Sequence, residues 1–385
     1  MGLTKDGLAH FDEVAAGYVA DDQVPGLVAL VAHGEEAHEV ALGFRSVGGP
    51  PVTRDSRFRI SSMSKPITGA ATLVLAGEGL FDLDEPVDRL LPELAGRRVL
   101  RRPDGPVDDT VPAVRAITAR DLLTFTFGFG QVIEMFAGGD PWPVVEAANA
   151  LHLATLGPPQ PGEAPDAETW IDRFATLPLL AQPGERWCYN SGAQVLGVLL
   201  GRAAGMPLDE VLRTRIFDPL GMDRTTFWAE ARLLPTAYMP GPEGLVVWDP
   251  PEGQWSRPPA FFDAAAGLVS DVDDMVAFGR MFLAGGSPVL SAAAVADMTR
   301  NHLTPEQRQG GAGFLGDAGW GFCTGVAVEG AQAGSFGWDG GLGTSWLVDP
   351  VRDLVVVVLT QRLFGGPLGA EVHRELQAAA YAALT

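Results

Sequence analysis

Ser62 and Lys65 stand three positions apart in the stretch Ser-Met-Ser-Lys, a spacing suited to nucleophilic catalysis. If a helix begins here, both side chains lie on one face about one turn apart, so the amine can reach the hydroxyl. A neutral amine can take the serine proton, and a charged one can stabilise the alkoxide. A helix N-terminus also favours developing negative charge on the serine. The simpler interpretation, that Ser62 only caps a helix, stays open at this point.

Lysine is scarce in this chain. Of 27 lysines and arginines only Lys5 and Lys65 are lysines, so arginine supplies almost all of the positive charge. Arginine keeps its proton at any usable pH, whereas a buried lysine can release it. An internal lysine in such a chain is therefore a candidate for proton transfer, with chance retention of a surface lysine as the alternative.

Two further segments carry side chains suited to the same chemistry. Tyr189 is one of four tyrosines and precedes a predicted helix, and a phenol beside a lysine can act as a base. Ser191 could relay a proton or orient the lysine. Residues 338–341, Trp-Asp-Gly-Gly, join two predicted strands, and glycines there let a backbone approach a ligand closely. Taken singly, the first segment is more typical of a half-buried aromatic with a helix cap, and the second of a hairpin turn.

Apolar periodicity predicts strands at both ends of the chain and helices between them. The predicted strands lie at residues 26–33, 37–44, 58–60, 320–328, 334–338, 344–348 and 354–360. The clearest predicted helices lie at residues 5–20, 62–76, 118–123, 167–177, 191–204, 208–216, 271–284 and 370–383. This order predicts an α/β protein of the α+β type, with one antiparallel sheet built from both chain ends and flanked by helices. Residues 1–81 and 235–385 would form the sheet lobe, residues 82–234 a mainly helical lobe, with the active site between them.

Composition and motifs exclude several classes of function. The formal net charge of −21 repels phosphate backbones, so we expect no nucleic-acid partner. We find neither a secretory signal nor an apolar run long enough to cross a membrane, and we expect a cytoplasmic protein without a membrane partner. The two cysteines, Cys188 and Cys323, are most simply two reduced thiols, although a disulfide between them stays open.

Other catalytic motifs are missing from the sequence. It contains no H-E-x-x-H, no clustered histidines and cysteines for a metal, no G-x-S-x-G nucleophile elbow and no phosphate-binding loop. We therefore expect no metal and no cofactor.

Taken together and in this order, these segments resemble the serine β-lactamase superfamily, and most closely its class C β-lactamase-like esterases, the family VIII carboxylesterases. The likeness covers nearly the whole chain. It is carried by FRISSMSKPITGAATLVLAGEG, ITARDLLTFTFGFG, PGERWCYNSGAQVLGVLLGRAAGMPLDEVLRTRIFDPLGM, AAAGLVSDVDDMVAFGRMFLAGG and GWDGGLGTSWLVDP. The resemblance implies a β-lactamase-like fold and a cofactor-free serine hydrolase.

By position, the resemblance implies that Ser62 is the acylated nucleophile and that Lys65 is the amine that activates it. Tyr189 would be the general base for acylation and the acid for the leaving group. The backbone N–H groups of Ser62 and Gly341 would form the oxyanion hole. The implied reaction is acyl transfer through an ester intermediate, followed by hydrolysis.

The sequence departs from the lactamase pattern at two positions expected to contact the substrate. Ser191 stands where lactamases have asparagine, and Trp338 stands where they have a lysine that holds the substrate carboxylate. Without that cation, a charged β-lactam or peptide C-terminus loses a contact worth about 1.5–3 kcal/mol. Asp339 and Gly340 complete the expected substrate-binding set, and Arg362 could restore a contact with an anion.

The expected activity is hydrolysis of small, uncharged and partly apolar carboxylic esters. Residues 130–182, with Phe136, Trp142 and Trp170, are expected to wall the acyl pocket. Three enzymatic alternatives stay open: a β-lactamase, a D-aminopeptidase or carboxypeptidase, and an acyltransferase. A catalytically silent binding module on the same fold is the non-enzymatic alternative, and no oligomeric state is predicted.

Overall fold

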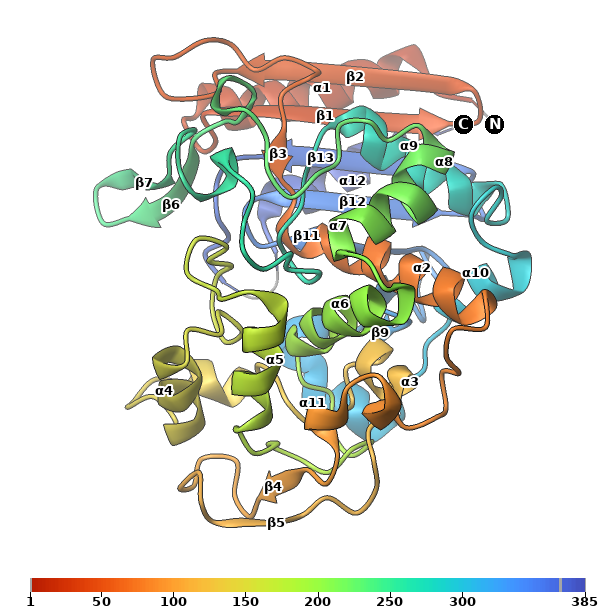
Figure 1. Ribbon diagram of the computed structural model, residues 1–385. Helices are drawn as coiled ribbons and strands as arrows, with labels where there is room; N and C mark the ends of the chain where they lie inside the picture. The colour runs from red at the N-terminus through yellow and green to blue at the C-terminus, as the bar shows by residue number, and fades with distance from the viewer. Residues whose placement is uncertain (1, 367–368, 385) are drawn as a thin grey trace.

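The computed structural model describes residues 2–366 and 369–384, and a seven-stranded antiparallel sheet forms its centre (Figure 1). Across the sheet the strands follow the order β2 (Glu36–Gly43), β1 (Gly26–His33), β13 (Leu354–Thr360), β12 (Thr344–Asp349), β11 (Phe336–Gly340), β10 (Gly325–Val326) and β9 (Gly319–Trp320). The two chain ends therefore meet in one sheet, as the sequence predicts. β13 is a continuous apolar run because it is buried along its whole length.

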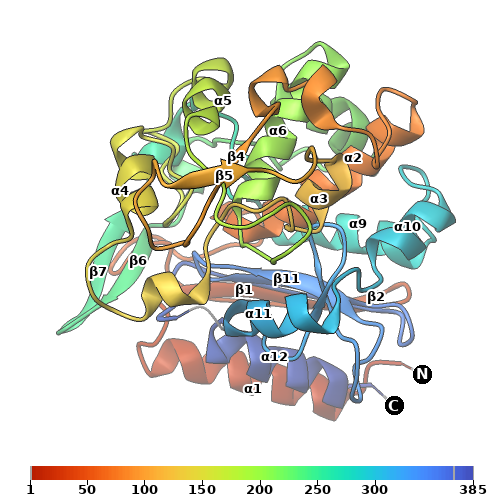
Figure 2. The ribbon, with the colours of Figure 1, turned by 90° about the horizontal axis from the view of Figure 1, so that it is seen from below.

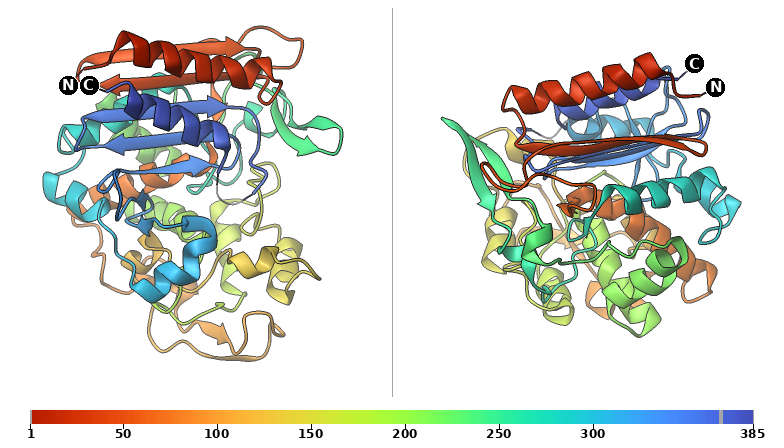
Figure 3. Two further views of the ribbon diagram at one scale, coloured as in Figure 1. Left: turned by 180° about the vertical axis from the view of Figure 1, so that it is seen from behind. Right: turned by 90° about the horizontal axis from the view of Figure 1, so that it is seen from above.

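Helices cover both faces of this sheet (Figures 2 and 3). On one face α1 (Lys5–Ala20) and α12 (Glu371–Ala382) lie side by side and pack a separate apolar cluster against the strands. On the other face α2 (Ser64–Gly77) and α9 (Val272–Leu283) belong to the main core. The remaining helices extend this second face into a thick layer, so the largest apolar cluster lies between the sheet and that layer.

The middle of the chain is helical, with short hairpins at its margins. Its helices are α3 (Ala119–Leu123), α4 (Pro143–Ala150), α5 (Ala167–Ala175), α6 (Ser191–Ala204), α7 (Leu208–Leu212), α8 (Asp218–Leu220), α10 (Ala292–Met298) and α11 (Pro305–Leu315). The hairpins and short pairs are β3 (Phe58–Arg59) with β8 (Val269–Ser270), β4 (Arg98–Leu100) with β5 (Thr110–Pro112), and β6 (Ala237–Gly241) with β7 (Gly244–Asp249). None of the helices in the described ranges is both long and apolar enough to span a bilayer.

Several elements differ from the sequence prediction. The strand expected at residues 58–60 pairs with β8 and stays outside the main sheet, and the strand expected at 320–328 is split into β9 and β10. Helices α4, α10 and α11 were not predicted. α11 contains three glycines, which lower helix propensity, but Thr304 and Gln307 form a capping box that stabilises its start.

Candidate active site

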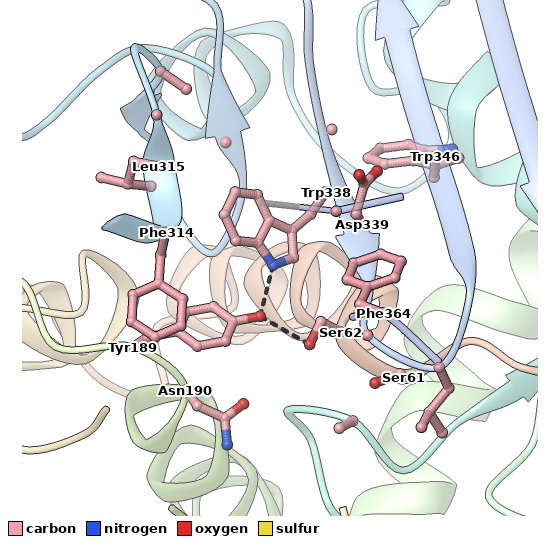
Figure 4. A pocket seen from close by; sticks show the side chains of 18 of the residues that line it. Ser61, Ser62, Tyr189, Asn190, Phe314, Leu315, Trp338, Asp339, Trp346 and Phe364 are labelled. Carbon is pink, nitrogen blue, oxygen red and sulfur yellow. Dashed lines mark hydrogen bonds between the residues drawn. The ribbon is translucent and has the colours of Figure 1, made fainter. Parts of the chain in front are cut away.

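Ser62 lies where the chain passes from β3 into α2, in a short 3-10 turn, Ser61–Met63. Ser61 has a φ of +48°, a left-handed conformation that costs energy for any residue with a Cβ and persists only where its surroundings enforce it. Strand β11 packs directly against this turn: a Cβ added at Gly340 would lie 2.2 Å from the Ile60 carbonyl oxygen. The turn places Ser62 on the wall of a cleft (Figure 4).

Lys65 lies about one turn after Ser62, at the start of α2, and is fully buried. Its Nζ donates a hydrogen bond to Ser62 Oγ over 2.8 Å and another to the Ala265 carbonyl oxygen over 3.0 Å. The same nitrogen lies 4.6 Å from the centre of the Tyr189 ring, close enough for a cation–π interaction. The structure thus brings together the amine and the hydroxyl that the spacing predicts to meet.

Tyr189 approaches the serine from the start of α6. Its hydroxyl donates to Ser62 Oγ over 2.8 Å and accepts from the Trp338 indole N–H over 2.8 Å (Figure 4). Its backbone exchanges two hydrogen bonds with Gln131, each 2.8 Å long. Gly130 makes this approach possible, because a Cβ there would lie 2.4 Å from the Tyr189 carbonyl oxygen. The indole N–H stabilises the phenol oxygen whenever that oxygen carries negative charge.

The end of β11 and the turn after it supply the third wall. Trp338, Asp339 and Gly341 line the cleft, whereas Gly340 packs against the turn that carries Ser62. Ser62 and Gly341 face the same cleft, and the pairing of their N–H groups as an oxyanion hole stays a prediction.

Two residues expected near the substrate do not line the cleft. Ser191 is fully buried and its hydroxyl lies 2.6 Å from that of Thr155, while the adjacent Asn190 lines the cleft. Arg362 donates to the Gln23 carbonyl oxygen over 2.9 Å, so its guanidinium is directed at the protein backbone and not at the cleft. Arg362 therefore does not supply the positive charge that the lactamases carry as a lysine at the position of Trp338.

The aromatic residues expected in the acyl wall divide between cleft and core. Phe136 lines the cleft. Trp170 is fully buried and stacks on Phe261 with 4.9 Å between ring centres, and Trp142 packs on the main core. Phe314, on the unpredicted α11, takes part in the wall and stacks on the tyrosine ring 5.2 Å away.

The cleft encloses about 680 Å³. Its described lining is mostly apolar and aromatic side chains and glycine backbone, with few polar groups, as is usual for small-molecule sites. Among the described lining residues, the charged side chains are two carboxylates, Asp263 and Asp339, and neither lysine, arginine nor histidine is present. The described lining therefore provides no basic side chain to neutralise a substrate carboxylate.

Residues 11–381 match the family model described as Beta-lactamase. The chain belongs to the beta-lactamase family. The family includes serine hydrolases, among them esterases, and acyltransferases. This assignment agrees with the resemblance carried by the serine, tyrosine and Trp-Asp-Gly-Gly segments.

Relatives of this beta-lactamase family member match it over most of their length. Protein Rv1367c of Mycobacterium tuberculosis is 35% identical over 87% of this chain and 85% of its own. Esterase EstB of Burkholderia gladioli is 30% identical over 94% of this chain and 92% of its own. The solved structure of EstCE1, described as a hydrolase with promiscuous acyltransferase activity, superposes with a TM-score of 0.83 at 24% identity, covering 98% of this chain and 99% of the other. The superposition shows the same fold.

Sequence reasoning missed one carboxylate close to Lys65, that of Asp263. Asp263 is buried, and its Oδ1 accepts from the Ala265 N–H over 2.8 Å and its Oδ2 from Gln194 Nε2 over 3.2 Å. Burial raises the pKa of the Asp263 carboxyl, and the charge of Lys65 opposes that shift. Through its hydrogen bond to the Ala265 N–H, Asp263 fixes the turn that contains Ala265. The carbonyl oxygen of Ala265 in turn accepts a hydrogen bond from Lys65 Nζ. Its position immediately before the run Ala-Ala-Ala-Gly is the only local signal in the sequence.

The two cysteines of this family member are free and buried, not joined by a disulfide. Burial raises the pKa of the Cys188 thiol to about 12, and it raises the pKa of Cys323 as well. Neither thiol lines the cleft. Within the described part of the chain, no group of three or more histidine, cysteine or acidic side chains is arranged to hold a metal ion.

Proposed function

We propose that this protein is a serine hydrolase that cleaves small, uncharged carboxylic esters through an acyl-enzyme intermediate. One observation carries the proposal: Ser62 Oγ receives hydrogen bonds from both Lys65 Nζ and the Tyr189 hydroxyl, each over 2.8 Å. A serine hydroxyl held between an amine and a phenol at the edge of a cleft is the arrangement an activated nucleophile requires. The match to Esterase EstB along nearly the whole chain supports an ester as substrate.

The proposed reaction begins with transfer of the Ser62 proton to the deprotonated Tyr189 oxygen, with Lys65 stabilising the negative charge on both oxygens. Ser62 Oγ then attacks the ester carbonyl carbon and forms a tetrahedral oxyanion. When this intermediate collapses, Tyr189 returns the proton to the leaving alcohol, and the acyl group stays on Ser62 as an ester. A water molecule, deprotonated by the same tyrosine, then attacks the acyl carbon. Tyr189 returns this proton to Ser62 Oγ as the serine–acyl bond breaks and the acid is released.

Besides Lys65, the backbone and one indole stabilise negative charge in this mechanism. The N–H groups of Ser62 and Gly341 are proposed to hold the oxyanion, because both residues line the cleft. The Trp338 N–H donates to the Tyr189 oxygen and stabilises it between the two proton transfers. A lysine at that position would instead present a cation to the substrate, so this replacement favours neutral substrates.

Acyl transfer to an alcohol or amine is the second candidate. It differs from hydrolysis only in the molecule that attacks the acyl-enzyme. The acyltransferase named monacolin J acid methylbutanoyltransferase, from Aspergillus terreus, is 30% identical over 60% of this chain and 56% of its own. The apolar lining of the cleft would favour an organic acceptor over water.

The deciding experiment measures hydrolysis of p-nitrophenyl butyrate and of a chromogenic cephalosporin by the wild type and by Ser62→Ala. We expect ester turnover that is lost in the variant, little cephalosporin turnover, and a phosphonate adduct on the peptide that contains Ser62. Ser287→Ala is the matched control, because it removes the hydroxyl of an exposed serine outside the cleft. Ester turnover that survives Ser62→Ala would overturn the proposed nucleophile. Strong cephalosporin turnover would instead identify a β-lactamase, and ester formation with added alcohols an acyltransferase.

A further inference from the structure

The two carboxylates that line the cleft are held in different ways. Asp263 is buried, and both of its oxygens accept hydrogen bonds from the protein. The side chain of Asp339 is 35% exposed, and within residues 2–366 and 369–384 its carboxylate forms no hydrogen bond. A carboxylate on the wall of a mostly apolar cleft is costly unless something satisfies it.

A buried imidazole lies beside this carboxylate. His373 Nδ1, on α12, is 3.6 Å from Asp339 Oδ2, longer than a hydrogen bond. His373 is fully buried, does not line the cleft, and both of its ring nitrogens lack a hydrogen-bond partner. The face of Asp339 toward the cleft stays available to a ligand.

An aromatic ring lies beside the same carboxylate. Phe364 and Asp339 both line the cleft, and Figure 4 shows the phenyl ring next to the carboxylate. A Cβ built on Gly369 would lie 2.7 Å from Asp339 Oδ2 and 3.9 Å from a ring carbon of Phe364, so the two side chains border the same small space. An aromatic ring together with a carboxylate is the combination that binds ammonium groups, through the ring quadrupole and through charge.

We infer that Asp339 and Phe364 form a subsite for an ammonium group carried by the ester substrate. The inference rests on the proposed function and extends its substrate class from neutral esters to esters bearing a quaternary or alkyl ammonium. The described lining of the cleft contains no lysine, arginine or histidine side chain, so no basic side chain of the cleft wall competes for this carboxylate. The same carboxylate repels a substrate anion and so adds to the selection against carboxylates.

Two pairs of esters of matched shape test the subsite. Butyrylcholine and 3,3-dimethylbutyl butyrate differ only in a trimethylammonium or tert-butyl group on the alcohol. The p-nitrophenyl esters of 4-(trimethylammonio)butanoate and 5,5-dimethylhexanoate place the same difference on the acyl side. We expect kcat/KM to favour the ammonium ester by at least about tenfold in one of the pairs, and that pair identifies the half of the substrate that reaches Asp339.

Variants then assign the preference to the residues. In Asp339→Asn the ratio of kcat/KM between ammonium and neutral ester should fall to near unity, and in Phe364→Leu it should fall part of the way. Asp172→Asn, which neutralises an exposed carboxylate on α5 outside the cleft, is the control and should keep the wild-type ratio. A wild-type ratio near or below unity in both pairs would overturn the inference, as would a preference that persists in Asp339→Asn. If the wild type turned over neither the ammonium esters nor the neutral esters, the proposed function would be overturned instead.

Discussion

The two sides of the cleft differ in how their polar groups are satisfied. On the side of the serine, Lys65 and Tyr189 both bond to Ser62 Oγ, and each has a further partner in the protein. On the other side, formed by Asp339 at the end of β11 and called the far side below, Asp339 and His373 lie 3.6 Å apart without a hydrogen bond between them. On the serine side the catalytic groups have their hydrogen-bond partners before any substrate binds, whereas on the far side the carboxylate of Asp339 has none.

The difference separates reaction from recognition. Groups that stabilise charge in a transition state act best when the fold has already oriented them, because no reorganisation is then needed during the reaction. A group that a ligand must satisfy is necessarily left without a protein partner, at a cost in stability. On this interpretation, substitutions on the serine side should reduce turnover of every ester, and substitutions on the far side should change the choice among esters.

The largest expected effect follows replacement of the buried lysine. Lys65→Met should lower kcat/KM for p-nitrophenyl butyrate by about a thousandfold or more, because it removes the cation on Ser62 Oγ while keeping an unbranched apolar side chain. Steady-state hydrolysis measures the loss. Lys5→Met, at the exposed start of α1, replaces the other lysine of the chain and should leave kcat/KM unchanged. Equal activity of the two variants would remove Lys65 from the mechanism.

A smaller loss is expected from Tyr189→Phe, which keeps the ring in its aromatic stack but removes the hydroxyl. Turnover should drop by about a hundredfold, since the proton path to and from the serine is lost. Tyr238→Phe is the control: its hydroxyl accepts from the Val47 N–H outside the cleft. Stopped-flow measurement of p-nitrophenol release distinguishes slow acylation from slow deacylation. A variant with wild-type kcat would show that another group carries the proton.

Sequence reasoning predicted the sheet and the serine side of the cleft because their signals are local. The one-turn spacing of Ser62 and Lys65 survives in the structure, since a helix fixes that distance whatever surrounds it. The buried runs of β1 and β13 identify central strands for the same reason. Tyr189 was found through its motif, and its contact with Ser62 spans 127 positions that no spacing rule covers.

The remainder of the site depends on packing between distant segments. Ser191 was expected at the lysine, but its hydroxyl is taken by Thr155, from a loop whose path no local pattern reveals. Asp263 was missed because Gln194, 69 positions away, becomes its neighbour only when α6 packs against the segment that carries Asp263. Phe314 was missed together with α11, whose glycines mask the helical pattern.

Removal of the indole N–H should have a moderate effect on turnover. Trp338→Phe keeps an aromatic ring but deletes the donor to the Tyr189 oxygen, so kcat should fall by about tenfold, the value of one hydrogen bond to a charged group. KM should change little. Both are measured with p-nitrophenyl butyrate. A change confined to KM would make Trp338 a substrate contact with no influence on the tyrosine.

The smallest expected effect compares the stability of the two carboxylate variants. Asp263→Ala leaves the Ala265 N–H and the Gln194 amide without acceptors, a loss offset in part because burial already disfavours the Asp263 charge, as its raised pKa indicates. We expect the free energy of unfolding to fall by about 1 kcal/mol. Asp339→Ala removes a carboxylate without a hydrogen bond and should change it by less than about 0.5 kcal/mol. Urea unfolding followed by circular dichroism measures both. If Asp339→Ala proves the more destabilising, the far side of the cleft is braced by this carboxylate, and its role is structural rather than one of recognition.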